Sequence, residues 1–445
     1  MTTLEKLADG LWGLSLEDVP EATLHSACRC LLDAFACAAA GGDHEAVRNA
    51  RTWVEGTFPL GLASVWFQAQ ARLPIGAGFV NSYATSVLDL DDGHRGAAGH
   101  PGAAIVPAVM ASVESLSAGM GDVLLAIVCG YEAGVRIAQA RAPARSPSVA
   151  TGRWSAAGVA AAVGKLRRLS SEQLASAIAI AEAQAPNLAA ADYSGFMGGD
   201  TKEGIPWSVL TGMAAVDQAA LGMKGYLSAL DNPEVYVPCA ADSLDKTFLI
   251  DATYFKVYGC CRWTHSAIDA VLQLRGAGIK PQMVREIEVS TFRRALSLQN
   301  LTRPPDVIAA QFSLPFTVAV TLVDGPGALL PLNPAVLGRK DIIEVAEHVR
   351  LKLDPEMDAC FPAQVAARVR LSTTAGEFER EVRTPLGDPA NPLLDKGLID
   401  KSVTLLAEVR PEDEVRELAR ELLSRNSGRP VKGRDPMKSI IAFLH

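Results

Sequence analysis

Apolar, alanine-rich helical segments occupy most of the first 222 residues of this chain and constrain its fold more than any other feature. Apolar side chains recur three or four residues apart, as Leu24, Cys28 and Leu31 do, which is the spacing of one face of an α-helix. Most of the segments are apolar on more than one face, which is typical of helices packed inside a large domain. The pattern predicts helices over residues 20–41, 75–88, 102–118, 120–140, 156–168, 171–185 and 205–222.

The pattern changes in the second half of the chain, where β-favouring segments appear. Residues 284–292 alternate as a strand does, and residues 366–385 predict two strands around a turn that contains Gly376. Between them the spacing predicts two helical stretches, at about 305–325 and 338–353. The last segments of the chain return to a helical pattern.

These segments predict a mainly α protein, with a large all-helical domain and an inserted smaller α+β lid domain that contains an antiparallel sheet. The predicted limits are 1–275 for the first part of the helical domain and 276–392 for the lid domain. Residues 393–445 are expected to form C-terminal helices that return to the helical domain.

The composition argues against several classes of protein. The net charge is −8, and the chain lacks the basic stripe that nucleic-acid binding needs. We expect no membrane span, because charged residues such as Glu132 interrupt the apolar runs. The N-terminus lacks the pattern of a signal peptide, and the eight cysteines form no disulfide or metal-binding spacing. These features predict a cytoplasmic location.

A polar loop runs directly into an apolar segment at residues 88–108, LDLDDGHRGAAGHPGAAIVPA. It holds Asp89, Asp91, Asp92, His94 and His100. A metal site is one explanation, but Arg95 in the same loop opposes a cation, so we expect no metal. A second explanation is a solvated loop in which Asp91 and Asp92 cap the next helix. The third is an acid/base site for a charged substrate.

Two further segments favour the acid/base site. Lys202 lies in the glycine-rich loop GGDTKEG, at residues 198–204. Residues 253–274 then bring together Lys256, Arg262, His265, Tyr258 and Trp263. Three cationic or titratable side chains flanked by aromatic ones are more typical of an anion pocket than of a solvated surface.

This set of residues suits proton transfer beside a carboxylate of the substrate. Negative charge builds up next to that carboxylate in the transition state, and fixed cations such as Lys202, Lys256 and Arg262 can stabilise it. His100 is the predicted base, because the start of the following helix lowers its pKa and keeps the ring neutral. Asp89 is expected to orient that ring. The sequence has no nucleophile elbow, dinucleotide fingerprint or P-loop, so no nucleotide cofactor is expected.

The same segments resemble the MmgE/PrpD family, which includes 2-methylcitrate dehydratases, cis-aconitate decarboxylases and an iminodisuccinate epimerase. The resemblance covers nearly the whole chain and rests on the order and spacing of several motifs. They are LLDAFACAAAG, the loop at 88–108, the TK pair at 201–202, FKVYGCCRWTHSAIDA and FSLPFTVAVTLVDG.

The resemblance implies a helical domain with an α+β lid, a homodimer, no cofactor and a site between the domains. It assigns the family's catalytic residues to Asp89, His100, Lys202, Lys256 and His265. Substrate contacts are expected from Arg262, Tyr258 and Arg153.

The chain departs from the family pattern at two places. Gly93 follows the double Asp, where dehydratases and decarboxylases of the family usually have Thr or Ser, and the loop to His100 is one residue longer. The segment TGRWSAAGVAAAVG has Arg153 and Trp154 where dehydratases often have a His. Both departures remove groups that could protonate a leaving hydroxyl.

An epimerase needs only a base on one face of the substrate and a proton donor on the other, for which His265 or Lys256 would serve. The sequence therefore favours a cofactor-independent epimerase of a di- or polycarboxylate, similar to iminodisuccinate epimerase. A dehydratase or decarboxylase of the same family is the alternative. A non-catalytic helical scaffold is a third hypothesis, which the retained site residues disfavour.

Overall fold

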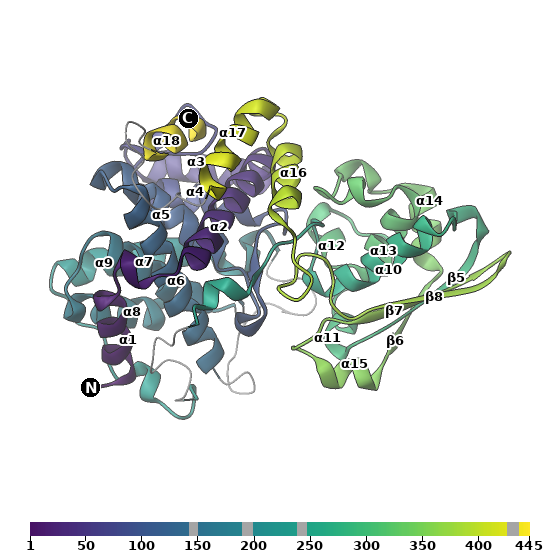
Figure 1. The fold of residues 1–445 in the computed structure, drawn as a ribbon, viewed down its shortest axis with the longest axis horizontal. Helices are drawn as coiled ribbons and strands as arrows, with labels where there is room; N and C mark the ends of the chain where they lie inside the picture. Colours follow the sequence, from purple (N-terminus) through teal and green to yellow (C-terminus); the bar gives the residue numbers. More distant parts are fainter. Residues whose placement is uncertain (142–149, 189–198, 238–246, 425–435) are drawn as a thin grey trace.

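The computed structural model describes residues 1–141, 150–188, 199–237, 247–424 and 436–445. Within these ranges the chain forms a large helical part and a smaller part built on a four-stranded sheet (Figure 1). This arrangement confirms the predicted fold class, a mainly α protein with a smaller α+β part.

Helices from both ends of the chain build the helical part. Its first helices are α1 (Thr3–Gly13), α2 (Glu21–Gly41), α3 (Glu45–Thr57), α4 (Pro74–Ser86), α5 (Gly102–Leu116), α6 (Met120–Ala140), α7 (Gly152–Leu166), α8 (Ser171–Gln184) and α9 (Ile205–Ala220). The C-terminal helices α16 (Asp395–Leu406), α17 (Glu412–Leu423) and α18 (Pro436–Leu444) return to it, and α16 packs against α2.

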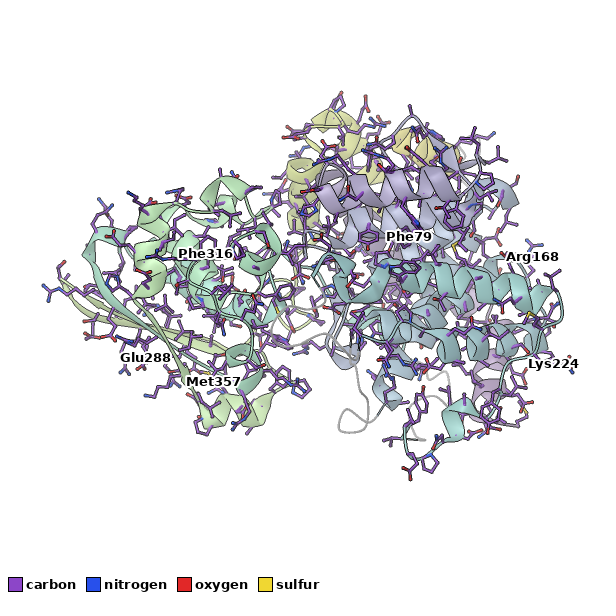
Figure 2. All side chains as sticks on the ribbon, turned by 180° about the vertical axis from the view of Figure 1, so that it is seen from behind. Phe79, Arg168, Lys224, Glu288, Phe316 and Met357 are labelled. Carbon is purple, nitrogen blue, oxygen red and sulfur yellow. The ribbon has the colours of Figure 1, made fainter. Side chains whose placement is uncertain are left out.

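Small residues let these helices approach closely, which explains the alanine-rich sequence. A Cβ atom on Gly158 of α7 would lie 2.8 Å from the carbonyl oxygen of Gly130 in α6. A Cβ atom on Gly130 would in turn lie 2.9 Å from the Cβ atom of Ala162. Larger side chains here would push α6 and α7 apart and open the core. Figure 2 shows Phe79 of α4 inside this part of the molecule, where it is buried.

Helix α6 is long and apolar enough to cross a membrane, although the sequence predicts that Glu132 interrupts the apolar run. Glu132 instead stays within the helix and pairs with Arg136, one turn later, at 2.7 Å. In the most apolar stretch of α6, 83% of the residues are buried inside the protein, which is typical of a core helix.

The smaller part packs helices on one face of the sheet. Its elements are α10 (His265–Gly276), β5 (Val284–Thr291), α11 (Arg293–Leu296), α12 (Val307–Gln311), α13 (Leu314–Val323), α14 (Lys340–Glu347), β6 (Val349–Leu353), α15 (Pro355–Cys360), β7 (Ala367–Thr373) and β8 (Gly376–Val382). Apolar residues of α10 and α13 share one buried cluster with β5 and β7. The other face carries cross-strand ion pairs such as Arg370–Glu379, at 2.9 Å.

Two details of this part correct the sequence predictions. The strand order is β6-β5-β7-β8, and β6 pairs with β5 in parallel, so the sheet is mixed and only its β5–β7 and β7–β8 pairs are antiparallel. The predicted helix at 338–353 ends at Glu347, and Val349–Leu353 form β6 instead. The sequence VRLKL alternates apolar and basic residues as a strand does, and the helices between β5 and β6 provide the crossover that a parallel pair needs.

The predicted domain limits stay a prediction. Helix α10, most of which those limits assign to the helical domain, packs against α13, β7 and β8 of the smaller part.

A buried ion pair joins the two ends of the helical part beneath the polar loop. Lys401 of α16 donates to Asp33 of α2 at 2.6 Å and to the carbonyl oxygen of Leu90 at 2.8 Å. Both side chains are almost fully buried. Removing one partner would leave the other charge buried without compensation, which is strongly destabilising.

We therefore expect Lys401→Met to lower the free energy of unfolding by about 3–5 kcal/mol, the usual range for a broken buried pair. Thermal and denaturant unfolding would measure the loss. The double variant Asp33→Leu/Lys401→Met removes both charges and should be more stable than Lys401→Met alone. Equal stability of the wild type and Lys401→Met would contradict this role.

Candidate active site

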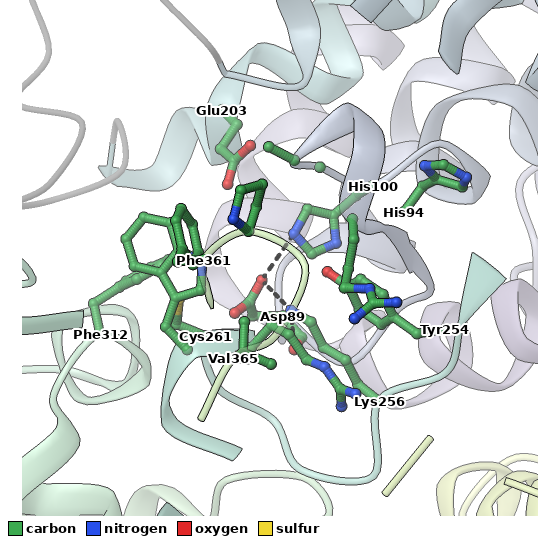
Figure 3. A pocket seen from close by; sticks show the side chains of 16 residues that line it. Asp89, His94, His100, Glu203, Tyr254, Lys256, Cys261, Phe312, Phe361 and Val365 are labelled. Atoms are coloured by element: carbon green, nitrogen blue, oxygen red, sulfur yellow. Dashed lines mark hydrogen bonds and ion pairs between the residues drawn. The ribbon is translucent and has the colours of Figure 1, made fainter. Parts of the chain in front are cut away.

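A pocket lies where loops of the helical part meet the smaller part (Figure 3). It encloses about 610 Å³ of free space, counting its open mouth. The residues that line it are Asp89, His94, Arg95, Ala98, Gly99, His100, Glu203, Tyr254, Lys256, Cys261, Arg262, Trp263, Phe312, Phe361, Pro362 and Val365.

Asp89 is the carboxylate around which the site is arranged. It follows the end of α4 in a left-handed backbone conformation, with φ of 53°, which is uncommon for a residue other than glycine. Its Oδ1 atom lies 2.9 Å from Lys256 Nζ, 3.9 Å from Lys202 Nζ and 3.6 Å from His100 Nε2. Burial would raise the pKa of Asp89, but Lys256, Lys202 and His100 hold it well below its usual range. Asp89 is therefore ionised.

Lys256 is positioned by a short pairing between distant segments. Strand β3 (Gly93–His94) pairs with β4 (Thr253–Tyr254), which brings Lys256 beside the polar loop. Lys256 Nζ donates to the backbone oxygen of Asp89 at 3.0 Å, in addition to the carboxylate. Burial would lower the pKa of Lys256, but Asp89 raises it above its ordinary value, so the ammonium stays charged.

Lys202 reaches the site from a strained loop. Lys202, Glu203 and Gly204 all have left-handed backbone conformations. Three such residues in a row persist only where surrounding contacts hold them, and Glu203 is held by the backbone N–H and the hydroxyl of Thr151, at 3.1 and 2.7 Å. Lys202 Nζ lies 5.4 Å from the centre of the Phe312 ring, which is a cation–π distance.

The surroundings of His100 differ from two predictions, that Asp89 orients its ring and that the helix start lowers its pKa. Its Nδ1 atom lies 3.1 Å from Asp91 Oδ2, so Asp91 is the nearer carboxylate and Asp89 faces the other ring nitrogen. Burial would lower the pKa of His100, but Asp91 more than offsets this effect, and the pKa is raised above its ordinary value. The two carboxylates, Asp91 above all, thus outweigh burial and the charge of Lys256, which shifts the pKa toward the protonated ring.

The explanation by a solvated, capping loop is wrong in its first part, because Asp91 and Asp92 are both buried, and its capping contact is found for Asp92 alone. Asp92 Oδ1 accepts a hydrogen bond from the backbone N–H of Gly102 at the start of α5, at 2.9 Å, and Asp92 also accepts from the Tyr131 hydroxyl. Burial, with a contribution from Asp33, raises the pKa of Asp92 to about 7. Asp91 instead faces His100.

Arg262 and His265 occupy different positions. Arg262 lines the pocket, donates to the backbone oxygen of Leu386 at 2.9 Å and lies 3.6 Å from Asp388. His265 is fully buried behind it, with Nδ1 at 3.2 Å from Arg262 Nη1 and Nε2 at 3.2 Å from the Cys260 carbonyl oxygen. Burial, Arg262 and Lys256 lower the pKa of His265, so the ring is neutral and both nitrogens are engaged.

Two of the predicted substrate contacts lie outside the pocket lining. The Tyr258 hydroxyl donates to Asp269 at 2.7 Å, and the centre of its ring lies 5.0 Å from the centre of the His265 ring. Arg153 pairs with Glu182 within the helical part, at 2.7 Å. Each side chain is committed to a structural partner, so the structure does not support direct contact between either of them and a substrate in this pocket.

Apart from Trp263, the apolar wall of the pocket was not predicted from the sequence. The smaller part and the segment leading into it contribute Trp263, Phe312, Phe361, Pro362 and Val365. In Figure 3, Phe312 and Phe361 lie on one side of Asp89, and Tyr254 and His94 lie on the other. Such a wall excludes water and strengthens the electrostatic interactions of the charged groups. Trp263 and Phe312 lie in motifs already named in the sequence, whereas no local motif marks Phe361, Pro362 and Val365, which join them only through the fold.

The site does contain a possible set of metal ligands. Oxygen and nitrogen atoms of Asp89, Asp91 and His100 lie within 4.8 Å of one another. The two ammonium groups at 2.9 and 3.9 Å from Asp89 Oδ1 already neutralise that carboxylate and would repel a cation placed there. The donor set therefore fits an anionic ligand between the cations better than a metal ion.

Comparisons with known proteins place the chain in a family. The MmgE/PrpD N-terminal domain matches residues 5–247, and the MmgE/PrpD C-terminal domain matches residues 258–425. The chain therefore belongs to the MmgE/PrpD family. It is 28% identical to a cis-aconitate decarboxylase of Aspergillus terreus, over 91% of this chain and 89% of the relative. It is 25% identical to the cis-aconitate decarboxylase-like protein oryM of Aspergillus oryzae, over 94% of this chain and 93% of the relative.

If Asp89 forms ion pairs with Lys202 and Lys256 and binds no metal, the protein should keep full activity after exhaustive EDTA treatment. Metal analysis of the dialysed protein should find no stoichiometric divalent ion. Loss of activity on chelation, followed by recovery when Zn²⁺ or Mg²⁺ is added, would show that the cluster of Asp89, Asp91 and His100 binds a metal.

Proposed function

We propose that this protein is a lyase that decarboxylates an unsaturated polycarboxylate of the cis-aconitate type. The observation that carries the proposal is the group of two ammonium ions and His100 within 3.9 Å of the Asp89 carboxylate. Asp89, His100 and Lys256 line the pocket itself, and Lys202 lies behind Asp89, outside the lining. The relatives named above, which cover nearly the whole chain, support a lyase rather than the epimerase that the sequence favours.

The groups at the pocket match the needs of this reaction. When the bond to the departing carboxylate breaks, CO₂ leaves and the bonding electron pair moves through the double bond to a neighbouring carbon. That carbon takes up a proton, for which the protonated ring of His100 is the proposed donor. Lys202, Lys256 and Arg262 would stabilise the negative charge that spreads onto the remaining carboxylates.

The geometry gives less support to epimerisation. An epimerase needs a second proton carrier on the opposite face of the substrate. His265 is a poor candidate for that role, because it is fully buried and both of its ring nitrogens already have partners. Lys256 is charged and engaged with Asp89, which makes it a better clamp than a base. Dehydration by the same residues is the second candidate.

Other features implied by the resemblance stay predictions. They are the homodimer, activity without a cofactor, a cytoplasmic location, and the absence of nucleic-acid and membrane partners.

Turnover in D₂O, followed by NMR, tests the proposed reaction directly. With cis-aconitate we expect release of CO₂ and an unsaturated dicarboxylate that carries one solvent-derived deuterium per molecule. The same screen includes citrate, 2-methylcitrate and iminodisuccinate. Formation of an alkene from a hydroxy acid would establish a dehydratase instead, and deuterium uptake with inversion and no CO₂ would establish an epimerase.

His100→Asn tests the role of His100 as the proton donor. It should lower kcat by about 10²-fold, the usual contribution of general acid catalysis. Wild-type activity should fall as the pH rises through the raised pKa of His100, because the acid form is lost, and the variant should lack this alkaline fall. The exposed His348→Asn should behave as the wild type. Near-normal turnover by His100→Asn would remove His100 from the mechanism.

A further inference from the structure

Tyr254 occupies the space that a side chain at position 93 would need. Gly93 and Tyr254 are directly paired across β3 and β4. A Cβ atom added to Gly93 would lie 2.3 Å from both Cζ and the hydroxyl oxygen of Tyr254. The φ angle of Gly93 is outside the left-handed region, so its backbone would accept other residues. The aromatic ring, rather than the backbone, therefore requires glycine at this position.

The Tyr254 ring is held firmly within the wall of the pocket. The Arg262 guanidinium lies over the ring, 4.7 Å from its centre. Tyr254 is only 5% exposed, and it lines the same pocket as Asp89, His100 and Lys256. Figure 3 shows it on the side of Asp89 opposite to Phe312 and Phe361.

The hydroxyl of Tyr254 makes no hydrogen bond to any residue in the described part of the chain, whereas Tyr131, Tyr236 and Tyr258 each donate to a carboxylate. Although Tyr254 as a whole is buried, its hydroxyl oxygen is not fully enclosed by protein atoms, so it is open to the pocket, where a ligand or water can accept its hydrogen bond. Burial raises the pKa of Tyr254, so the group keeps its proton and acts as a donor.

We propose that Tyr254 is a catalytic residue of this pocket, whose hydroxyl donates a hydrogen bond to a carboxylate oxygen of the substrate. This inference rests on the proposed function for the identity of the ligand, a polycarboxylate. Gly93 and Tyr254 then act as a pair, in which the absence of a side chain at one position makes room for the hydroxyl supplied by the other. A preorganised donor at this place would stabilise the charge that develops on the carboxylate.

Tyr254→Phe tests the donor, because it removes one oxygen atom and keeps the ring beneath Arg262. We expect kcat/KM for cis-aconitate to fall by about 10²-fold, as for the loss of one oxyanion donor. The Kd for tricarballylate, a saturated analogue that cannot react in this way, should rise by about tenfold. The unfolding temperature should stay that of the wild type, and Tyr226→Phe, at an exposed tyrosine, should change neither constant.

A second pair of variants tests whether the hydroxyl itself matters. Gly93→Ser/Tyr254→Ala returns a hydroxyl to the same space, whereas Gly93→Ala/Tyr254→Ala does not. The serine variant should bind tricarballylate at least threefold more tightly than the alanine variant. Equal affinities in this pair, or a Tyr254→Phe protein with wild-type Kd and kcat/KM, would overturn the inference.

Measuring both the turnover of cis-aconitate and the Kd for tricarballylate separates this inference from the proposed function. If the wild type binds tricarballylate but does not decarboxylate cis-aconitate, the proposed reaction fails and the Kd values still decide the role of Tyr254. If the wild type neither binds tricarballylate nor turns over any acid of the screen, both proposals are overturned.

Discussion

The contact between Asp89 and two buried ammonium groups is the interaction on which the candidate site depends. Lys202 and Lys256 are almost fully buried, and burying an ammonium group is costly unless an anion lies beside it. Asp89 supplies that anion through one oxygen atom, at 2.9 and 3.9 Å. It also faces His100, so three segments far apart in the sequence converge on a single carboxylate.

Backbone strain accompanies this convergence. Asp89, Lys202 and Glu203 have left-handed backbone conformations, although none of them is glycine. Such conformations cost about 1–3 kcal/mol each and persist only where other contacts hold them. The helical part provides that support through Thr151, which binds Glu203, and through Lys401, which binds the Leu90 carbonyl beside Asp89. The core thus stabilises loops that the chemistry requires.

The sequence allowed the fold class to be predicted because helical spacing and alanine content are local properties, repeated over many segments. It failed at Val349–Leu353, where a five-residue strand is too short to distinguish from the end of a helix. Within the site, Asp89, His100, Lys202 and Lys256 could be predicted from their motifs, and the structure brings all four together. Whether Tyr258 and Arg153 contact a substrate could not be predicted from their motifs, because only the fold shows that each is bound to a partner outside the pocket lining.

The state of His100 is the property that sequence reasoning predicted least well, because it depends on distances. Its position at the start of α5 suggests a neutral ring, whereas Asp91 at 3.1 Å favours the protonated one. A protonated His100 acts as an acid, and this difference changes the predicted chemistry from proton abstraction to proton donation. The sequence position of His100 thus gives no measure of its pKa, which depends on the distances to Asp91, Asp89 and Lys256 and on burial.

An NMR titration of the histidine side chains measures this state most directly, with the His100 signals assigned by their loss in His100→Gln. We expect a pKa for His100 above 6.5, the ordinary histidine value, and a lower pKa in Asp91→Asn because the stabilising carboxylate is removed. A pKa below 6.5 in the wild type, or one that Asp91→Asn leaves unchanged, would contradict the assignment of His100 as the acid.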